Sequence, residues 1–343
     1  MTRPLEIPLE VSHGLGVPDG ETKAVHKVTT RTNTHQLGEQ AVRHPDDVRE
    51  VYERILADAA VGHRYIETRS GRRVHLIEAG EGPPVVLLHG GGTSSLSHLP
   101  FLAHLKGVRA INVDRPGFGL SDPVHVPRER YRDGAIEFID EVLDALGLES
   151  TALAGASGGG IWALWYAFAH PERVRRLALI TAVPLLPGTR VPMPVRVAVA
   201  PLVGDLLAKV KPSPQMVVRF MAAMGEKDTV VRHPGVIESL VAAGRDPIAS
   251  AAGLAENRAI ASPFGFRPSL RVHPDDLRRL TAPTLVIWGD HDPTGTVEAA
   301  QRATSLIPNA QLEVLPAGHV PWFGHAERVA GLLSGFVRSD GEA

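Results

Sequence analysis

The sequence contains no cysteine, and its 343 residues carry a formal net charge of only −2. Without cysteine the protein can form neither a disulfide scaffold nor a thiolate metal site, and a cysteine nucleophile is excluded. The near-neutral charge and the lack of a basic block argue against a nucleic-acid partner. With 43% hydrophobic and 22% charged residues, the composition is that of an ordinary globular protein.

Long apolar runs are also lacking. The N-terminus, Met1 to Glu6, does not have the continuous apolar stretch of a secretory signal. The most apolar region, residues 195–207, is interrupted by Arg196 and Asp205 and is too short to span a bilayer. We therefore expect a cytoplasmic protein without a membrane span. The sixteen histidines form no His-Glu-x-x-His motif and no tight cluster with carboxylates, so we expect neither a metal nor a cofactor.

The chain is long enough for two domains, or for one large domain with an insertion. Residues 1–43 mix polar, glycine and proline residues without a period, which favours an extended or poorly ordered arm. A helix start is then predicted at His44-Pro45-Asp46-Asp47. Proline and acidic residues favour the first turn of a helix, and the apolar residues that follow recur on one face.

Short apolar strands that alternate with helices make up most of the remaining chain. Residues 64–68 and 73–78 flank a Ser70-Gly71 turn and predict a hairpin. Further strands are predicted at residues 85–88, 108–113, 152–154, 177–180, 284–288 and 312–315, with helices at 136–146 and 161–169. Such alternation indicates an α/β fold with a mostly parallel central sheet and helices on both faces.

The alternation stops over residues 183–275, which are rich in proline and methionine. We interpret this inserted segment as a helical lid over the sheet. The predicted organisation is an N-terminal arm and extra helix (1–65), an α/β core (66–182 and 276–343) and the lid (183–275). We expect the extra helix to pack against the lid or against a second subunit, which leaves a homodimer open.

The strongest motif is Gly155-Ala156-Ser157-Gly158-Gly159, between a predicted strand and a predicted helix. A serine on so tight a turn needs small neighbours, and its hydroxyl is exposed at a helix N-terminus beside backbone N–H groups. The alternative is a glycine-rich turn or a phosphate-binding loop. Such a loop would normally continue with Lys-Ser/Thr, whereas Ile161-Trp162 follows here. We therefore predict that Ser157 is a nucleophile.

A serine nucleophile needs a base and an acid that orients the base. A predicted strand leads into Asp290 and Asp292. We favour Asp292, because Asp290 directly follows the strand in a turn and is expected to cap it. Two histidines lie further along, His319 in the loop after the last strand and His325 at a helix start, and the loop position makes His319 the expected base. The chain order serine, aspartate, histidine is one of the known orders for this triad.

A glycine-rich turn, His89-Gly90-Gly91-Gly92, follows another predicted strand. It can direct a backbone N–H at the carbonyl that the serine attacks. We expect the N–H groups of Gly91 and Gly158 to hold the oxyanion, with Gly92 as the second choice in place of Gly91.

A further motif is Asp114-Arg115-Pro116-Gly117-Phe118-Gly119-Leu120-Ser121-Asp122. All these motifs occur in the order typical of the α/β-hydrolase fold superfamily, which the chain resembles over about residues 66–340. The Asp114 segment is typical of the branch with epoxide hydrolases, dehalogenases, C–C bond hydrolases and many esterases. Epoxide hydrolases and haloalkane dehalogenases use aspartate where this chain has Ser157. C–C hydrolases commonly carry tryptophan just after the histidine, a position that Val320 occupies here, with Trp322 two residues later.

We expect a serine hydrolase that cleaves carboxylic esters or lactones of small, largely apolar molecules through an acyl-enzyme on Ser157. The alternatives are a C–C bond hydrolase of vinylogous diketones and an acyltransferase with the same triad. A receptor, a lyase and a cofactor-free dioxygenase also occur on this fold. The methionine stripe of the lid is plain core, an adaptable apolar ceiling over the serine, or both in one helix. The expected pocket residues are His98, Trp162, Met216, Phe220, Met224 and Trp322.

Overall fold

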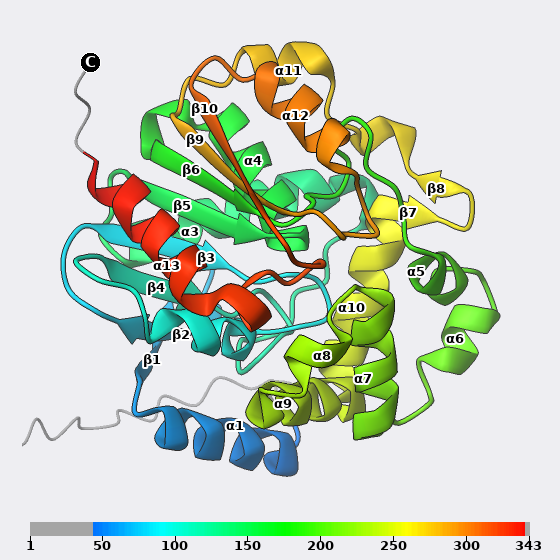
Figure 1. Ribbon diagram of the computed structural model, residues 1–343. Helices are drawn as coiled ribbons and strands as arrows, with labels where there is room; N and C mark the ends of the chain where they lie inside the picture. Colours follow the sequence, from blue (N-terminus) through cyan, green and yellow to red (C-terminus); the bar gives the residue numbers. More distant parts are fainter. Residues whose placement is uncertain (1–43, 340–343) are drawn as a thin grey trace, which may run out of the picture. The chain divides into compact units, whose positions relative to one another are not determined.

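The computed structural model describes residues 44–339, so the arm predicted for residues 1–43 lies outside the described residues (Figure 1). Within residues 44–339, eight strands form one sheet in the order β1-β2-β4-β3-β5-β6-β9-β10. These strands are β1 (Gly62–Glu67), β2 (Arg73–Ala79), β3 (Pro84–Leu88), β4 (Arg109–Val113), β5 (Thr151–Ala156), β6 (Val174–Ile180), β9 (Thr284–Gly289) and β10 (Ala310–Leu315).

The sheet is antiparallel at one edge and parallel elsewhere. Strands β1 and β2 form the predicted hairpin, in which Gly71 has a φ of +74° at the turn. Strand β2 also pairs with β4 in antiparallel orientation. All neighbours from β4 to β10 are parallel. The predicted α/β class with a mostly parallel sheet is confirmed.

Helices cover both faces of the sheet because its central strands are apolar on both sides. In β3, Val86 and Leu88 contribute to one core cluster, while Val85 and Leu87 contribute to the other. The first cluster is covered by α3 (Tyr131–Ala145), α4 (Gly158–Ala169) and α12 (Val297–Ser305). The second is covered by α2 (Leu99–Leu102) and α13 (Trp322–Arg338).

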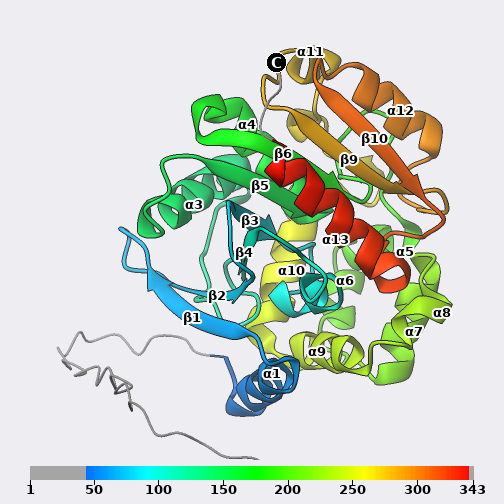
Figure 2. The same ribbon diagram turned by 60° about the vertical axis from the view of Figure 1, so that its left-hand side comes forward.

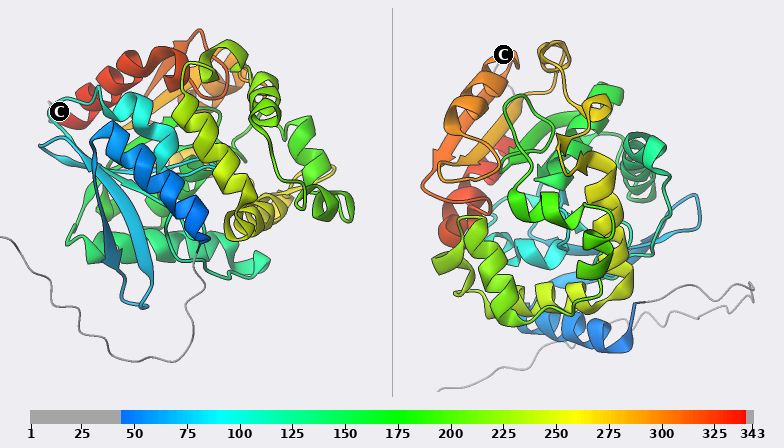
Figure 3. Two further views of the ribbon diagram at one scale, coloured as in Figure 1. Left: turned by 90° about the horizontal axis from the view of Figure 1, so that it is seen from below. Right: turned by 90° about the vertical axis from the view of Figure 1, so that its right-hand side faces the viewer.

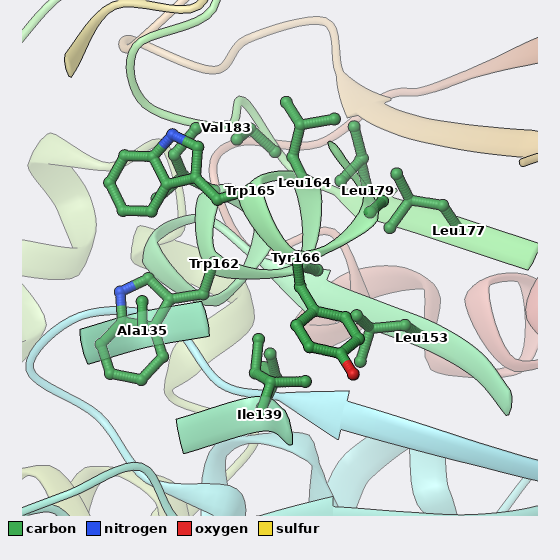
Figure 4. Packing of buried hydrophobic residues seen from close by; sticks show 14 of the residues in the cluster. Ala135, Ile139, Leu153, Trp162, Leu164, Trp165, Tyr166, Leu177, Leu179 and Val183 are labelled. Atoms are coloured by element: carbon green, nitrogen blue, oxygen red, sulfur yellow. The ribbon is translucent and has the colours of Figure 1, made fainter. Parts of the chain in front are cut away.

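Figure 4 shows part of the first cluster, with side chains of α4 packed against α3 and the sheet. Trp162 and Tyr166 lie on the side of α4 that faces Ala135 and Ile139 of α3. Leu153 of the sheet packs into the same cluster. The helix that begins at the predicted nucleophile is therefore buried on almost every side, which fixes its N-terminus in place.

The inserted segment forms helices between β6 and α11 (Pro274–Arg278), all of whose residues lie in the described part of the chain. A short hairpin, β7 (Ala261–Ser262) and β8 (Gly265–Phe266), was not expected from the sequence. The helices are α5 (Met193–Ala198), α6 (Val203–Leu207), α7 (Pro214–Ala223), α8 (Lys227–Val230), α9 (Pro234–Arg245) and α10 (Pro247–Ile260). The helical character is as predicted, and the role as a lid stays a prediction.

The extra helix predicted near residue 46 is α1 (Asp46–Ala59), and it packs beside α9 (Figures 2 and 3). Acidic Asp46 and Asp47 occupy its first turn, where they interact favourably with the helix dipole. Its buried face carries Tyr52 and Leu56, and its exposed Arg54 forms an ion pair with Glu238 of α9. The expectation that this helix packs against the inserted segment is confirmed.

No helix within residues 44–339 has both the length and the apolar character that a bilayer span requires. The most apolar stretch predicted from the sequence, residues 195–207, is divided between the short helices α5 and α6.

Candidate active site

Ser157 lies at the turn from β5 into α4, with the left-handed backbone conformation φ 48° and ψ −114°. This strained geometry is held by close backbone contacts on both sides. A Cβ atom on Gly155 would lie 2.3 Å from the carbonyl oxygen of Gly159, and one on Gly159 would lie 2.3 Å from that of Leu88. Only glycine fits at either position, so the strand and the helix approach closely and the serine is presented at the tip of the turn.

His319 and Asp292 lie next to Ser157 in a hydrogen-bonded chain. The Ser157 hydroxyl donates to Nε2 of His319 across 3.0 Å, and Nδ1 of His319 donates to Oδ2 of Asp292 across 2.8 Å. The loops after β5, β9 and β10 supply these three side chains, which meet at the carboxyl ends of neighbouring parallel strands. The geometry is that of a nucleophile, a base and an orienting acid.

The carboxylate of Asp292 is buried and accepts several hydrogen bonds besides the one from His319. Oδ1 accepts the N–H and the hydroxyl of Thr294 at 2.8 and 2.7 Å, and Oδ2 accepts the N–H of Ala182 at 3.1 Å. Burial alone would raise the pKa of Asp292, but the charge of His319 and these hydrogen bonds outweigh it and lower the pKa. The acid is therefore held ionised and in one orientation.

The pKa of His319 is raised above its ordinary value. Burial lowers it, but the charge and the hydrogen bond of Asp292 have the larger combined effect, and the charge of Glu226 adds to them. A raised pKa means that the site stabilises the imidazolium, which is the form that the base takes after it has accepted a proton.

Asp290 and His325, the other aspartate and histidine in these loops, lie elsewhere. Asp290 accepts the N–H of Ala317, just beyond β10, at 3.1 Å and pairs with the exposed His291, so its contacts join the loops after β9 and β10. His325 donates to the carbonyl oxygen of Pro316 across 3.1 Å. Neither side chain contacts Ser157, so the observed geometry favours Asp292 and His319.

The N–H groups predicted to hold the oxyanion come close together. A Cβ atom on Gly158 would lie 3.1 Å from the nitrogen of Gly91. Among residues 44–339, no group accepts a hydrogen bond from the N–H of Gly91 or Gly158. Gly92 has a φ of +67°, and a Cβ atom there would meet no other atom within 4 Å. Two neighbouring N–H groups are thus available to hold an oxyanion, and the assignment of Gly91 and Gly158, with Gly92 as the second choice, stays a prediction.

A cavity of about 480 Å³ opens beside Ser157 and His319. Its walls come from the sheet domain and from the inserted segment, and most of the exposed atoms in it are apolar. Four of the predicted pocket residues line it: Met216, Phe220, Met224 and Trp322. The methionine stripe of α7 forms part of the cavity wall, while Val217 and Met221 also pack into the second core cluster, so the helix contributes to both the core and the cavity.

His98 and Trp162 do not line the cavity, which corrects the expectation for both. His98 is buried in the core, where its ring lies 5.1 Å from that of Trp322 and shares a 3.0 Å hydrogen bond with Asn112. Burial lowers the pKa of His98 to about 4, so it is neutral near neutral pH. Trp162 faces α3 and donates to the hydroxyl of Tyr131 across 2.9 Å. Closeness to a motif along the chain did not place either side chain at the substrate.

A buried ion pair beside the oxyanion glycines was not predicted from the sequence. Arg115 is fully buried and donates to both carboxylate oxygens of Glu256 at 2.9 and 3.0 Å. Glu256 comes from α10 and lines the cavity, and a Cβ atom on Gly158 would lie 2.6 Å from its Oε1. The pairing with Arg115 balances the negative charge of this carboxylate beside the glycine N–H groups.

Two further polar residues were missed. Thr294 anchors Asp292, and its spacing of two residues after an aspartate is a local turn signal that could have indicated it. Glu226 lies in the inserted segment, 94 residues from the backbone N–H of Val320 that it binds, and no motif marks it.

No group of three or more histidine, aspartate or glutamate side chains in the described part of the chain is arranged to hold a metal ion. The histidine and carboxylates of the site bind one another, neighbouring hydroxyl groups or backbone N–H groups.

Curated relatives of the chain are named as hydrolases. The chain is 31% identical over 284 residues to a 2-hydroxymuconate semialdehyde hydrolase from Pseudomonas putida, covering 78% of this chain and 92% of the relative. It is 28% identical over 291 residues to a 2-hydroxy-6-oxo-6-phenylhexa-2,4-dienoate hydrolase from Burkholderia cepacia, with the same coverages of 78% and 92%.

Solved structures share the fold at lower identity. A carboxylesterase from Bacillus subtilis matches with a TM-score of 0.65 and 24% identity, over 86% of this chain and 98% of its own. The 2-hydroxy-6-oxo-6-phenylhexa-2,4-dienoate hydrolase from Rhodococcus sp. strain RHA1 matches with a TM-score of 0.65 and 22% identity, over 81% and 100%. The model of the family described as alpha/beta hydrolase fold matches residues 83–326, so the chain belongs to the α/β-hydrolase family of enzymes.

Proposed function

We propose that the protein is a serine hydrolase that cleaves a C–C bond beside a ketone carbonyl in a vinylogous diketone. The observation that carries this proposal is the hydrogen-bonded chain of Ser157, His319 and Asp292 at the wall of a largely apolar cavity. The names of the curated relatives support C–C cleavage as the reaction type. The ester hydrolysis expected from the sequence alone becomes the second candidate.

In the first half of the reaction, His319 accepts the proton of Ser157 and the serine oxygen attacks the ketone carbon. The N–H groups of Gly91 and Gly158 bind the oxyanion that forms. Collapse of this intermediate breaks the C–C bond, and the electron pair leaves with a carbon that is conjugated with the second carbonyl. That carbon takes the proton from His319, which leaves an acyl group on Ser157.

In the second half, water attacks the acyl group. His319 accepts a proton from this water, and the second tetrahedral intermediate uses the same two N–H groups. Its collapse releases a carboxylic acid and returns the proton to Ser157. Asp292 stays ionised throughout and stabilises the imidazolium in both halves.

Ester hydrolysis is the second candidate because one local feature favours it. Val320 occupies the position after the base where C–C hydrolases of this branch commonly carry tryptophan, and its side chain lines the cavity. The chemistry differs only at the leaving group, which would be an alkoxide oxygen instead of a stabilised carbon.

A comparison of two substrate types tests the reaction type. The purified protein is assayed with 2-hydroxy-6-oxo-6-phenylhexa-2,4-dienoate, followed by the loss of its conjugated absorbance, and with nitrophenyl esters of graded acyl length. We expect kcat/KM for the diketone to exceed that for the best ester by about tenfold or more. If an ester is cleaved faster than the diketone, ester hydrolysis replaces the proposed function. If neither substrate type is cleaved, both candidate functions are contradicted.

The rate is expected to fall on the acid side of neutrality. The base must be neutral to accept the serine proton, and its pKa lies above the ordinary 6.5 because Asp292 outweighs the effect of burial. Below that pKa, kcat/KM should drop by about tenfold for each pH unit. A profile of kcat/KM from about pH 5 to about pH 9 checks this, with circular dichroism to confirm that the fold persists. A midpoint below 6.5 would contradict the predicted effect of Asp292.

A further inference from the structure

Glu226 is a buried carboxylate that the proposed triad does not include. It lies between α7 and α8 of the inserted segment, and only 1% of it is exposed. Its Oε1 accepts the N–H of Val320 across 2.9 Å, and its other oxygen accepts the hydroxyl of Thr229. Val320 directly follows His319, so this carboxylate binds the loop that carries the base.

The backbone of the same segment is also attached to that loop. The carbonyl oxygen of Met224 accepts the N–H of His319 across 2.8 Å. A Cβ atom on Gly318 would lie 2.4 Å from this oxygen, and one on Gly225 would lie 2.9 Å from Cα of Gly318. Both glycines are therefore required for the contact, and residues 224–226 hold His319 and Val320 through two hydrogen bonds.

Few charged groups face the imidazole within residues 44–339. Asp292 binds its Nδ1 from the loop after β9, and Glu226 faces it from the inserted segment. On the same loop as Asp292, Asp290 and His291 pair with each other, and 36% and 75% of their side chains are exposed. The charges that act on the imidazole in the described part of the chain are those of Asp292 and Glu226, both buried, while the buried pair of Arg115 and Glu256 lies beside Gly158.

We propose that Glu226 is a positioning residue of the triad, which holds the loop of His319 from the inserted segment and places a second negative charge beside the imidazole. The inference rests on the proposed function, since it requires His319 to act as a base. It follows that the inserted segment is coupled to the catalytic loop, because a shift of α7 and α8 would move the hydrogen bonds that orient His319.

The charge of Glu226 acts in the same direction as that of Asp292. Burial raises the pKa of Glu226 above its ordinary value, although hydrogen bonds from Thr229 and Val320 oppose this. Once ionised, it favours the imidazolium and so raises the pKa of His319. Loss of the charge alone should therefore lower the pKa of the base, and loss of the hydrogen bond should in addition loosen its loop.

Two substitutions separate these effects. Glu226→Gln keeps an oxygen that can accept the N–H of Val320 and removes the charge, while Glu226→Ala removes both. Glu238→Gln is the control, since it removes a carboxylate of the inserted segment that points outward and pairs with Arg54. The measured quantity is the rate at which a fluorophosphonate labels Ser157 as a function of pH, which depends on the base and not on the natural substrate.

For Glu226→Gln we expect the midpoint of the labelling profile to move roughly one pH unit lower, with a plateau reduced by about three- to tenfold. For Glu226→Ala we expect the plateau to fall by about 10- to 100-fold, because a buried N–H is left without its acceptor. Thermal unfolding and the downfield proton resonance of His319 Nδ1 show whether the fold and the His319–Asp292 bond persist. The Glu238→Gln profile should superimpose on that of the wild type.

A purely structural role would lower the melting temperature of Glu226→Gln and leave the midpoint in place, which would overturn the inference. Superposition of the Glu226→Gln and wild-type profiles would do the same. If the wild-type protein reacts with no fluorophosphonate at all, the proposed function has failed instead, and the two failures are thereby distinguished.

Discussion

Replacement of Ser157 by alanine is expected to lower kcat by about 10⁶-fold for any substrate that the protein hydrolyses. The strained turn presents one hydroxyl to Nε2 of His319, and with no cysteine in the chain there is no thiolate to replace it. Binding should survive, because the cavity and the two glycine N–H groups remain. Steady-state kinetics, together with mass spectrometry after fluorophosphonate treatment, measure the loss directly.

The matched control is Ser305→Ala. Ser305 lies exposed on α12, where its hydroxyl donates to the carbonyl oxygen of Arg302. This variant should retain wild-type turnover and labelling. Turnover by Ser157→Ala within about 100-fold of the wild type would mean that another group attacks the substrate, and the proposed mechanism would be wrong.

The fold and the geometry around Ser157 could be predicted because their signals are local. The alternation of apolar strands and helices predicts a mostly parallel sheet covered by helices, and each motif directly follows a strand. Parallel strands bring their carboxyl ends to one edge of the sheet, and the observed strand order places β5, β9 and β10 within the same half of it, so Ser157, Asp292 and His319 lie close together. The structure adds the hydrogen bonds that connect them.

Pocket residues predicted only from their closeness to a motif were partly wrong. Trp162 is five residues beyond Ser157, and the turn of α4 directs its side chain toward Tyr131. The ring of His98 packs against that of Trp322, and of these two residues only Trp322 lines the cavity. The distance along the sequence from a motif does not show whether a side chain reaches the cavity, because its direction depends on the packing of its helix.

Two acidic residues that were missed come from the inserted segment. Glu256 lies in α10 and Glu226 lies between α7 and α8, neither belongs to a motif, and each binds a partner far along the chain. Arg115, the partner of Glu256, is 141 residues away. The sequence alone does not show whether an acidic residue of this segment is buried and paired, because that depends on how the segment packs in the folded protein.

Removal of one member of the buried ion pair should strongly destabilise the fold. Glu256→Ala leaves the guanidinium of Arg115, which is 0% exposed, without a countercharge. The rings of Trp162 and Phe118, 4.7 and 5.2 Å from its central carbon, compensate only in part. We expect the free energy of unfolding to fall by about 3–5 kcal/mol. Urea denaturation followed by tryptophan fluorescence measures the change.

The double variant Arg115→Met with Glu256→Leu distinguishes an unpaired charge from lost packing. It fills similar volume without any charge, and its unfolding free energy is expected to lie within about 1 kcal/mol of the wild type, because apolar replacement of a buried pair is often neutral. If the double variant has nearly the unfolding free energy of the wild type, the loss of stability in Glu256→Ala comes from the unpaired guanidinium of Arg115. If the double variant were as unstable as the single one, the pair would be stabilising the fold through its hydrogen bonds, and its loss could not be repaired by apolar side chains.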